Sequence, residues 1–397
     1  MLFKLGLKNL KQNPIINILI VFQMTVVFII TISMVSTIVS RFKFYTPIDD
    51  YLNSNGSFYS ISNAVNPTTG ATLRTTDELY DLLEGEKEII ASFSAWLSYN
   101  QDNSVFTSYD DKFIQMYTPE LESGCWFDLN KTSSDVIQVV VSENPYGFKT
   151  GDKITLDSFG IEINAEIIGI LKPNTKIIGF SPSKNGKYDC RNTFINYNYS
   201  IEEKPLFILS QSELIDKKVT LQLNGPVYVT YENNISESVI EKNNGIMTQM
   251  MTLNITPFDS MKKNSLDYIF QQIYILLPIL ICILILTLVS AISVSALSAK
   301  RQLKNYAVYY ICGLKWKQCA LINFYSALIS VLVSFVLSII SIIVIIITDS
   351  FGETVIELGM WQILSCILIM TIYVLLSVLL PISIIGNNTP NQVLRSN

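Results

Sequence analysis

The chain has 397 residues, a formal net charge of −5 and an apolar content of 49%, but only 15% of its residues are charged. Soluble domains carry about 25% charged residues, so the composition is not that of an ordinary soluble enzyme. The chain contains no histidine, which excludes Ser-His-Asp catalysis, Cys-His catalysis and histidine-based metal sites. The phosphate-loop pattern G-x-x-x-x-G-K-[ST] is also missing. The sequence therefore predicts a non-catalytic chain with no cofactor and no metal site.

Four runs of the chain carry no charged residue, and each is long enough to cross a bilayer as a helix. They are 15–40, 268–299, 318–348 and 358–388. Because lipid offers no partner to backbone amides, we expect all four to be helical. One such run could be a buried helix of a soluble protein, but four argue for a membrane protein. The first run exceeds the roughly 7–15 residues of a signal-peptide core, so we interpret it as a retained anchor.

The segments between these runs differ in charge. Residues 1–14 and 299–317 contain lysine and arginine but no acidic residue, whereas 349–357 contains three acidic residues and no basic one. The tail contains only Arg395. Short loops rich in Lys and Arg stay in the cytoplasm. Both termini and 299–317 are therefore predicted inside, and 349–357 outside together with 41–267, which holds 30 acidic and 19 basic residues.

These observations predict an α-helical membrane protein with four transmembrane helices and an α+β extracytoplasmic domain inserted between helices 1 and 2. The predicted segments are a cytoplasmic amphipathic helix (1–14), transmembrane helix 1 (15–40), the extracytoplasmic domain (41–267), transmembrane helix 2 with a stalk (268–298), a cytoplasmic loop (299–317), transmembrane helix 3 (318–348), an extracytoplasmic loop (349–358), transmembrane helix 4 (359–385) and a cytoplasmic tail (386–397). The runs contain no acidic or basic residue, so no ion pathway is indicated. Gln23 and Asn323 lie deep in them and are expected to hydrogen-bond between helices.

The large outer segment has the alternation and composition of a folded domain. Strands rich in β-branched residues are expected at 136–142, 153–171, 205–210 and 218–231. A helix is expected at 75–89, which begins with a Thr cap and acidic residues, and another at 235–251, where Asn-Asn-Gly is able to interrupt it. We expect two lobes. Cys125 and Cys190 both belong to this segment, but the sequence does not decide whether they pair.

Several motifs, in order along the chain, resemble those of FtsX/MacB-type permease subunits of ABC transporters. The motifs are "LFKLGLKNLKQNPIINILIVF" (2–22), "ESGCWF" (122–127), "VVVSENPYGFKTGDKITL" followed by "AEIIGIL", "AVYYICGLKWKQ" (307–318) and "TPNQVLRSN" (389–397). Three positions depart from the family pattern: Gly6 replaces an alanine, Cys125 an arginine and Asn305 a glutamate. The resemblance covers the whole chain, although each motif alone is weak.

The resemblance implies that the basic segment is a short helix over 300–313 that docks into a separate ATPase subunit. Tyr306, Tyr309 and Tyr310 would share one helical face, and Gly313 would end the helix in a left-handed conformation. The candidate coupling residues are Arg301, Lys304, Tyr306, Ala307, Val308, Tyr309, Tyr310, Gly313, Lys315, Trp316 and Gln318. The alternative is a positive-inside anchor with tyrosines at the lipid headgroups.

The implied function is a permease in which ATP hydrolysis by separate MacB-type ATPase subunits moves the extracytoplasmic domain. The run 268–299 is longer than one bilayer crossing, which suggests a stalk, with a kink or hinge at Pro278. The implied partners are the ATPases, a second permease copy or paralogue, membrane lipid and an extracytoplasmic protein, but no nucleic acid. The implied location is a bacterial plasma membrane.

Two functions remain open from the sequence. The first is extrusion or extraction of a peptide, lipid-linked or amphiphilic molecule, which the size of the outer domain favours because the cell-division members of the family carry a smaller one. The second is a signalling module that moves an extracellular partner, such as a cell-wall hydrolase or a sensor. The sequence does not identify a substrate or a direction.

Overall fold

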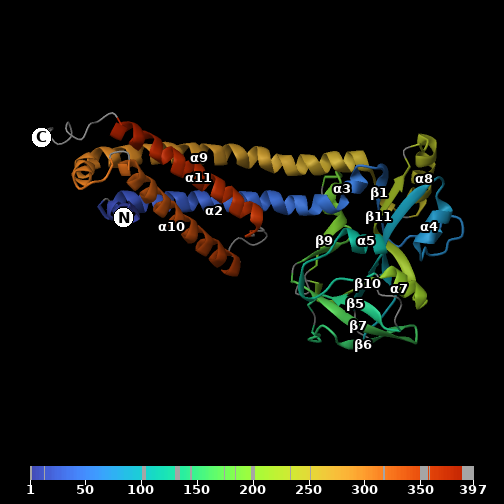
Figure 1. The fold of residues 1–397 in the computed structure, drawn as a ribbon. Helices are drawn as coiled ribbons and strands as arrows, with labels where there is room; N and C mark the ends of the chain where they lie inside the picture. The colour runs from blue at the N-terminus through green and yellow to red at the C-terminus, as the bar shows by residue number, and fades with distance from the viewer. Residues whose placement is uncertain are drawn as a thin grey trace. The chain divides into compact units, whose positions relative to one another are not determined.

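The computed structural model describes residues 2–12, 14–100, 104–129, 135–143, 145–173, 175–183, 185–197, 202–232, 234–250, 252–315, 318–348, 356 and 358–386. The chain divides into two compact units (Figure 1). The first, the helical unit, combines residues 1–42 with 269–397. The second, the sheet domain, comprises residues 43–268. The tail motif 389–397 and Trp316 lie outside the described residues.

The helical unit is built from five helices. They are α1 (Leu2–Gln12), α2 (Pro14–Tyr45), α9 (Phe258–Ile311), α10 (Gln318–Thr348) and α11 (Met360–Gly386), of which α2 and α9 continue into the sheet domain. In the described part of the chain, four helices are long and apolar enough to cross a membrane: one within α2, α9 itself, one within α10 and one within α11. Each of the four uncharged runs therefore contains a long helix, as the sequence predicted.

Helix α10 packs through a stripe of small polar residues. Ser326, Ser330, Ser334 and Ser338 recur every fourth residue and are all buried. The Ser334 hydroxyl donates to the Val21 carbonyl of α2 at 3.1 Å. Small side chains of this kind let two helix backbones approach closely and hydrogen-bond directly, which stabilises helices in lipid. The stripe thus explains how α1 and α2 lie so close to α10.

The deep amides of the apolar runs join helices, as expected. Gln23 of α2 donates through Nε2 to the Thr287 hydroxyl of α9 at 3.3 Å, and its Oε1 accepts from Ser290 at 3.2 Å. Such bonds contribute about 0.6–2 kcal/mol each in a membrane.

Helix α9 differs from the prediction at both ends. It runs without interruption for 54 residues, so 299–311 is the end of a long helix and not a separate short one. At 1.5 Å per residue it is about 80 Å long. Pro278 lies within it. The helix also begins ten residues before the predicted span, inside the sheet domain.

The sheet domain contains a mixed sheet of ten strands in the order β12-β1-β11-β2-β3-β10-β5-β7-β4, with β6 paired to β7. Its strands are β1 (Asn55–Ile61), β2 (Lys87–Ala95), β3 (Val105–Tyr109), β4 (Leu121–Gly124), β5 (Ile137–Val141), β6 (Lys153–Ser158), β7 (Ile161–Leu171), β10 (Leu206–Ser210), β11 (Leu221–Tyr231) and β12 (Thr252–Pro257). The pairs β3–β10 and β5–β7 are parallel and the others are antiparallel. Two further strands, β8 (Lys176–Ile178) and β9 (Phe194–Asn196), form a separate antiparallel pair.

Short helices lie at the ends of these strands. They are η1 (Thr46–Ile48), α3 (Asp49–Leu52), α4 (Thr76–Leu82), α5 (Asp111–Met116), η2 (Cys190–Thr193), α7 (Gln211–Asp216) and α8 (Glu237–Gln249). An apolar core of the domain includes Tyr59, Phe93, Val139, Ile167, Phe207 and Val229. The strands join in one continuous path and the domain forms one compact unit, so the two lobes expected from the sequence are not separated.

One helix prediction in this domain was wrong in extent, and in a second helix a possible interruption does not occur. The helix predicted at 75–89 ends at Leu82, because the chain turns at Gly85 (φ +81°) and Lys87 begins β2, which pairs with β11. The helix at 235–251 is not interrupted by Asn243, Asn244 and Gly245. Asn243 is fully buried and bonds to both backbone groups of Glu84, so its amide serves tertiary structure and not a turn.

The cysteines of the sheet domain are both free. Cys125 is exposed and Cys190 is buried. Burial raises the pKa of the Cys190 thiol to about 12, so this thiol stays neutral and unreactive at physiological pH.

Candidate functional site

Helices α1, α9 and α10 of the helical unit meet where α9 ends and α10 begins, with Ile385 of α11 beside them. Tyr306 of α9 is fully buried there, in an apolar cluster with Leu314, Cys319, Ile322 and Ile385. Helix α1 packs on α10 beside this cluster, with Leu5 against it. Gly6 of α1 allows the close crossing, since a Cβ atom there would lie 3.0 Å from the Cβ of Tyr325. This contact accounts for a glycine at this position of α1.

A buried polar network ties the same three helices together. The Tyr306 hydroxyl lies 3.0 Å from Gln302 Oε1 and 3.0 Å from Asn323 Oδ1. Asn9 of α1 donates to Asn323 at 3.3 Å and accepts from Gln302. Among the described residues, the Asn323 amide nitrogen has no hydrogen-bond partner. The network fixes the orientation of Tyr306 and holds α1 against the end of α9.

The end of α9 is closed by a Schellman motif. Gly313 adopts φ +97°, its N–H donates to the Tyr310 carbonyl at 3.0 Å, and the Leu314 N–H donates to the Tyr309 carbonyl at 3.0 Å. Glycine has no Cβ and adopts this left-handed conformation without strain. The helix therefore ends at the glycine that the sequence indicated.

Helix α10 begins with a reciprocal cap. The Gln318 side chain accepts from the Lys315 N–H at 3.0 Å, while the Gln318 N–H donates to the Lys315 carbonyl at 2.8 Å. Gln318 thus has a structural role at the start of α10, which the sequence resemblance did not reveal.

The structure divides the predicted coupling residues into two groups. Tyr306 and Ala307 are fully buried, and Tyr309 is half-buried against the apolar cluster. The three tyrosines expected to share one face therefore differ in exposure: Tyr306 points into the bundle, Tyr309 is half-buried and Tyr310 is exposed. Arg301, Lys304, Val308, Tyr310, Gly313 and Lys315 are exposed.

The exposed residues form a continuous line on α9. Lys304, Val308 and Ile311 follow one another at helical spacing, and Val308 and Ile311 are 50% and 67% exposed. We call these three residues the α9 stripe. Arg301 precedes the stripe by one turn and is also exposed. Ile311 was not among the residues selected from the sequence, although its spacing from Val308 was visible there.

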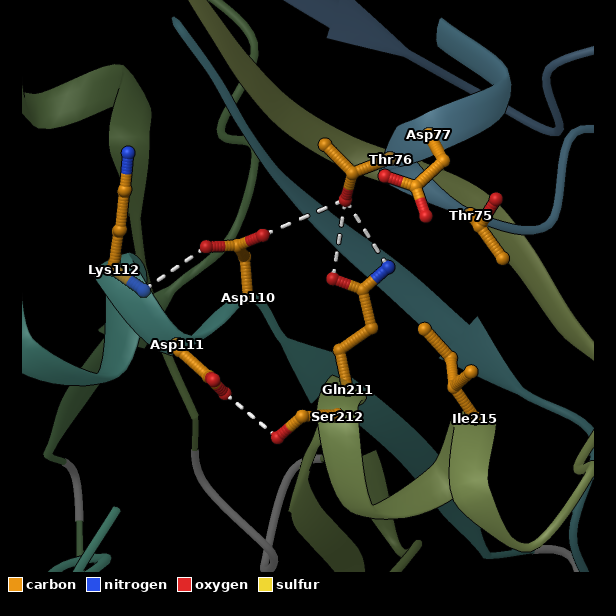
Figure 2. Close-up of a pocket in the computed structure, with 9 residues that line it drawn as sticks. All are labelled: Thr75, Thr76, Asp77, Asp110, Asp111, Lys112, Gln211, Ser212 and Ile215. Atoms are coloured by element: carbon orange, nitrogen blue, oxygen red, sulfur yellow. Dashed lines mark hydrogen bonds between the residues drawn. The ribbon is translucent and has the colours of Figure 1, made fainter. Parts of the chain in front are cut away.

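The sheet domain contains a polar pocket of about 320 Å³ where α4, α5 and α7 begin (Figure 2). The Thr76 hydroxyl lies 3.2 Å from Gln211 Oε1 and 3.5 Å from Asp110 Oδ2. Asp111 accepts from the Ser212 hydroxyl at 2.9 Å. The polar groups thus bond largely to one another, as the dashed lines in Figure 2 show.

One charged side chain of this pocket caps a helix. Asp110 accepts from the Lys112 N–H at 2.9 Å as the N-cap of α5. Burial raises the pKa of the Asp110 carboxyl above its ordinary value. Lys112 extends to Glu88 at 2.6 Å. Among the described residues, no group of three or more His, Cys, Asp or Glu side chains is placed to hold a metal ion.

Comparisons with known proteins give only distant structural likenesses. No protein-family model and no curated protein matches the chain. The periplasmic region of MacB from Actinobacillus actinomycetemcomitans is 10% identical, with a TM-score of 0.29, over 56% of this chain and 96% of that one. The extracellular domain of the noncanonic ABC-type transporter YknZ from Gram-positive bacteria is 14% identical, with a TM-score of 0.29, over 51% of this chain and 100% of that one. At TM-scores this low, neither likeness assigns a function.

Proposed function

We propose that the chain is a permease subunit of an ABC transporter, which couples ATP hydrolysis by a separate ATPase to movement of its sheet domain. The observation that carries this proposal is helix α9. It is one uninterrupted helix that begins in the sheet domain, continues as an apolar span and ends in the exposed α9 stripe. An uninterrupted helix moves as a stiff body, so a displacement at one end is passed along its length.

The α9 stripe has the chemistry of a contact surface for a protein. Val308 and Ile311 offer apolar area, while Arg301 and Lys304 add fixed positive charge. Protein interfaces typically combine an apolar centre with charged groups at the rim. In the proposed arrangement the stripe faces the cytoplasm, the sheet domain lies outside, and the ATPase binds the stripe. Two ATPase half-sites require two permease chains, so the working unit is a dimer.

The chain itself would not hydrolyse ATP. It has no histidine and no phosphate loop. Extrusion or extraction of a peptide, lipid-linked or amphiphilic molecule is the activity we propose for the complex.

A signalling role is the second candidate. In that case the same movement acts on an extracellular protein and no substrate is carried. The direct hydrogen bonds between the beginning of α9 and the sheet domain favour this candidate, because they join the helix to the folded domain itself.

The test is a charge reversal on the stripe. Lys304→Glu places an acidic group where the partner is expected to present acidic groups, and like charges across an interface cost several kcal/mol. The matched control is Lys4→Glu, which reverses an exposed lysine of α1. Each variant is purified from native membranes in mild detergent, and the co-purified ATPase is identified and assayed for ATP hydrolysis.

We expect Lys304→Glu to lose at least about 90% of the bound ATPase and its activity, corresponding to about 1.4 kcal/mol or more, while Lys4→Glu retains both. Equal recovery and hydrolysis in the two variants, at equal insertion into the membrane, would show that the stripe does not bind the ATPase.

A further inference from the structure

The beginning of α9, which follows directly from β12, also bonds to one short segment of the sheet domain. We call this segment, Tyr188–Phe194, the strap; it contains η2. The Cys190 N–H donates to the Ser265 hydroxyl at 2.8 Å, and Asn264 donates to the Tyr188 carbonyl at 2.9 Å. Ser265 and Cys190 are fully buried, so the bond between them is shielded from water, whereas the Asn264–Tyr188 bond is only partly buried.

An arginine adds a second, geometrically defined contact. The guanidinium of Arg191 lies 3.7 Å from the centre of the Tyr268 ring. Its orientation is fixed by Asp189, whose two carboxylate oxygens accept from Nε at 2.9 Å and from Nη2 at 2.7 Å. The Asp189 side chain is only 5% exposed. The Arg191 side chain is 50% exposed, but the bidentate pair holds its guanidinium plane in one position over the Tyr268 ring.

The other side of the strap contacts the sheet and the end of α2. The Thr193 and Tyr228 hydroxyls are 2.5 Å apart, and Tyr228 belongs to β11, an interior strand of the sheet. The Phe194 ring lies 5.4 Å from that of Phe44, near the end of α2. The strap therefore hydrogen-bonds to α9 and to the sheet, and it also packs against the end of α2.

We propose that the strap is the mechanical joint that makes the beginning of α9, the end of α2 and the sheet move as one body, with Arg191 and Ser265 as positioning residues. This inference rests on the proposed function in one respect only, namely that an ATPase drives the movement of α9. The joint itself is a property of the isolated chain. The strap would pass displacement from the helix into β11 in addition to the direct connection of α9 to β12.

The joint is tested by hydrogen exchange on the full-length protein in detergent. In the wild type, amides of 258–268 should exchange as slowly as those of β11, because one cooperative unit opens together. In Ser265→Ala and Arg191→Ala, the amides of 258–268 should exchange about tenfold faster or more, with β11 and thermal unfolding of the domain unchanged. Arg191→Lys keeps the charge but loses the planar, bidentate geometry, so it should behave like Arg191→Ala.

The control is Lys263→Ala, an exposed position on the same helical segment, which should exchange as the wild type does. The proposal is overturned if 258–268 already exchanges fast in the wild type. It is also overturned if neither Ser265→Ala nor Arg191→Ala changes that exchange, or if the control changes it equally. Faster exchange of β11 together with 258–268 in Ser265→Ala or Arg191→Ala would reveal general unfolding and would also contradict a local joint.

A second measurement separates this inference from the proposed function. With the ATPase bound, addition of ATP should alter exchange in both 258–268 and β11 of the wild type, but only in 258–268 of Arg191→Ala. Stimulated ATP hydrolysis with no response of β11 in the wild type would refute the joint and leave the permease role intact. Failure to bind any ATPase would refute the permease role, while the exchange comparison in the isolated chain would still decide the joint.

Discussion

Asp110 carries a carboxylate that is buried at the start of α5 and still caps the helix through the Lys112 N–H. Because burial raises its pKa, the folded domain favours the protonated form relative to the unfolded chain. The contribution of this carboxyl to the free energy of unfolding is therefore greatest at low pH, and it falls as the pH rises through the raised pKa.

We predict that Asp110→Asn stabilises the protein at pH 7, because asparagine is an equally good N-cap and carries no charge to desolvate. The advantage over the wild type should shrink as the pH falls through the raised pKa of Asp110, where the wild-type carboxyl is already protonated. Thermal unfolding of both proteins at pH 7 and at a series of lower values checks this. A variant that is less stable than the wild type at pH 7 would show that the ionised carboxylate is net stabilising.

Three residues show which features could be predicted from the sequence and which could not. Gly313 was identified as a helix end from its type alone, because few other residues tolerate its backbone conformation. The inward direction of Tyr306 could not be predicted, since its spacing fits both a docking face and a packing face. Asn243 belongs to a stretch able to interrupt a helix, but its side chain instead bonds to Glu84, 159 residues away in the chain, and to Tyr231.

At the scale of elements, packing between helices depends on the small residues of α10. Ser334 is fully buried and donates a hydrogen bond to α2, so a larger side chain at this position would have to push the two helices apart. Long apolar helices and the strands at 137–141, 206–210 and 221–231 were predictable from charge-free runs and β-branched residues. The crossings between elements were not, because they depend on residues far apart in sequence.

We predict that Ser334→Leu separates α10 from α2 and lowers stability by about 1–3 kcal/mol, the usual cost of overpacking. The matched control is Thr371→Leu, an exposed position of α11, which should change stability by less than about 0.5 kcal/mol. Thermal unfolding of both variants in detergent makes the comparison. Equal stability of the two variants would mean that the serine stripe has no packing role.

At the scale of the whole molecule, the four candidate spans and the mixed sheet domain were evident from composition and alternation. The continuity of α9 was not, because a basic stretch after an apolar run resembles a loop. The orientation of the chain in the membrane is inferred from the charge of its short segments. The exposed thiols of Cys125 and Cys312 are two native positions at which this orientation can be tested.

We predict that a variant retaining only Cys125 is labelled by an impermeant maleimide on intact cells. A variant retaining only Cys312 should be labelled only after the cells are permeabilised. The comparison uses the same reagent and equal amounts of protein in the membrane. Labelling of Cys312 but not of Cys125 on intact cells would reverse the proposed topology.

Contact between the end of α9 and an ATPase is the central claim, and a site-specific photo-crosslink tests it most directly. A photoreactive amino acid is introduced at Ile311 of the stripe, or at Leu286, which lies on the same helix and is equally exposed at 68% against 67%. After irradiation in cells, the cross-linked protein is identified by mass spectrometry. The account predicts an ATPase with a phosphate loop at Ile311 and none at Leu286. No ATPase at Ile311, or the same products at both positions, would contradict it.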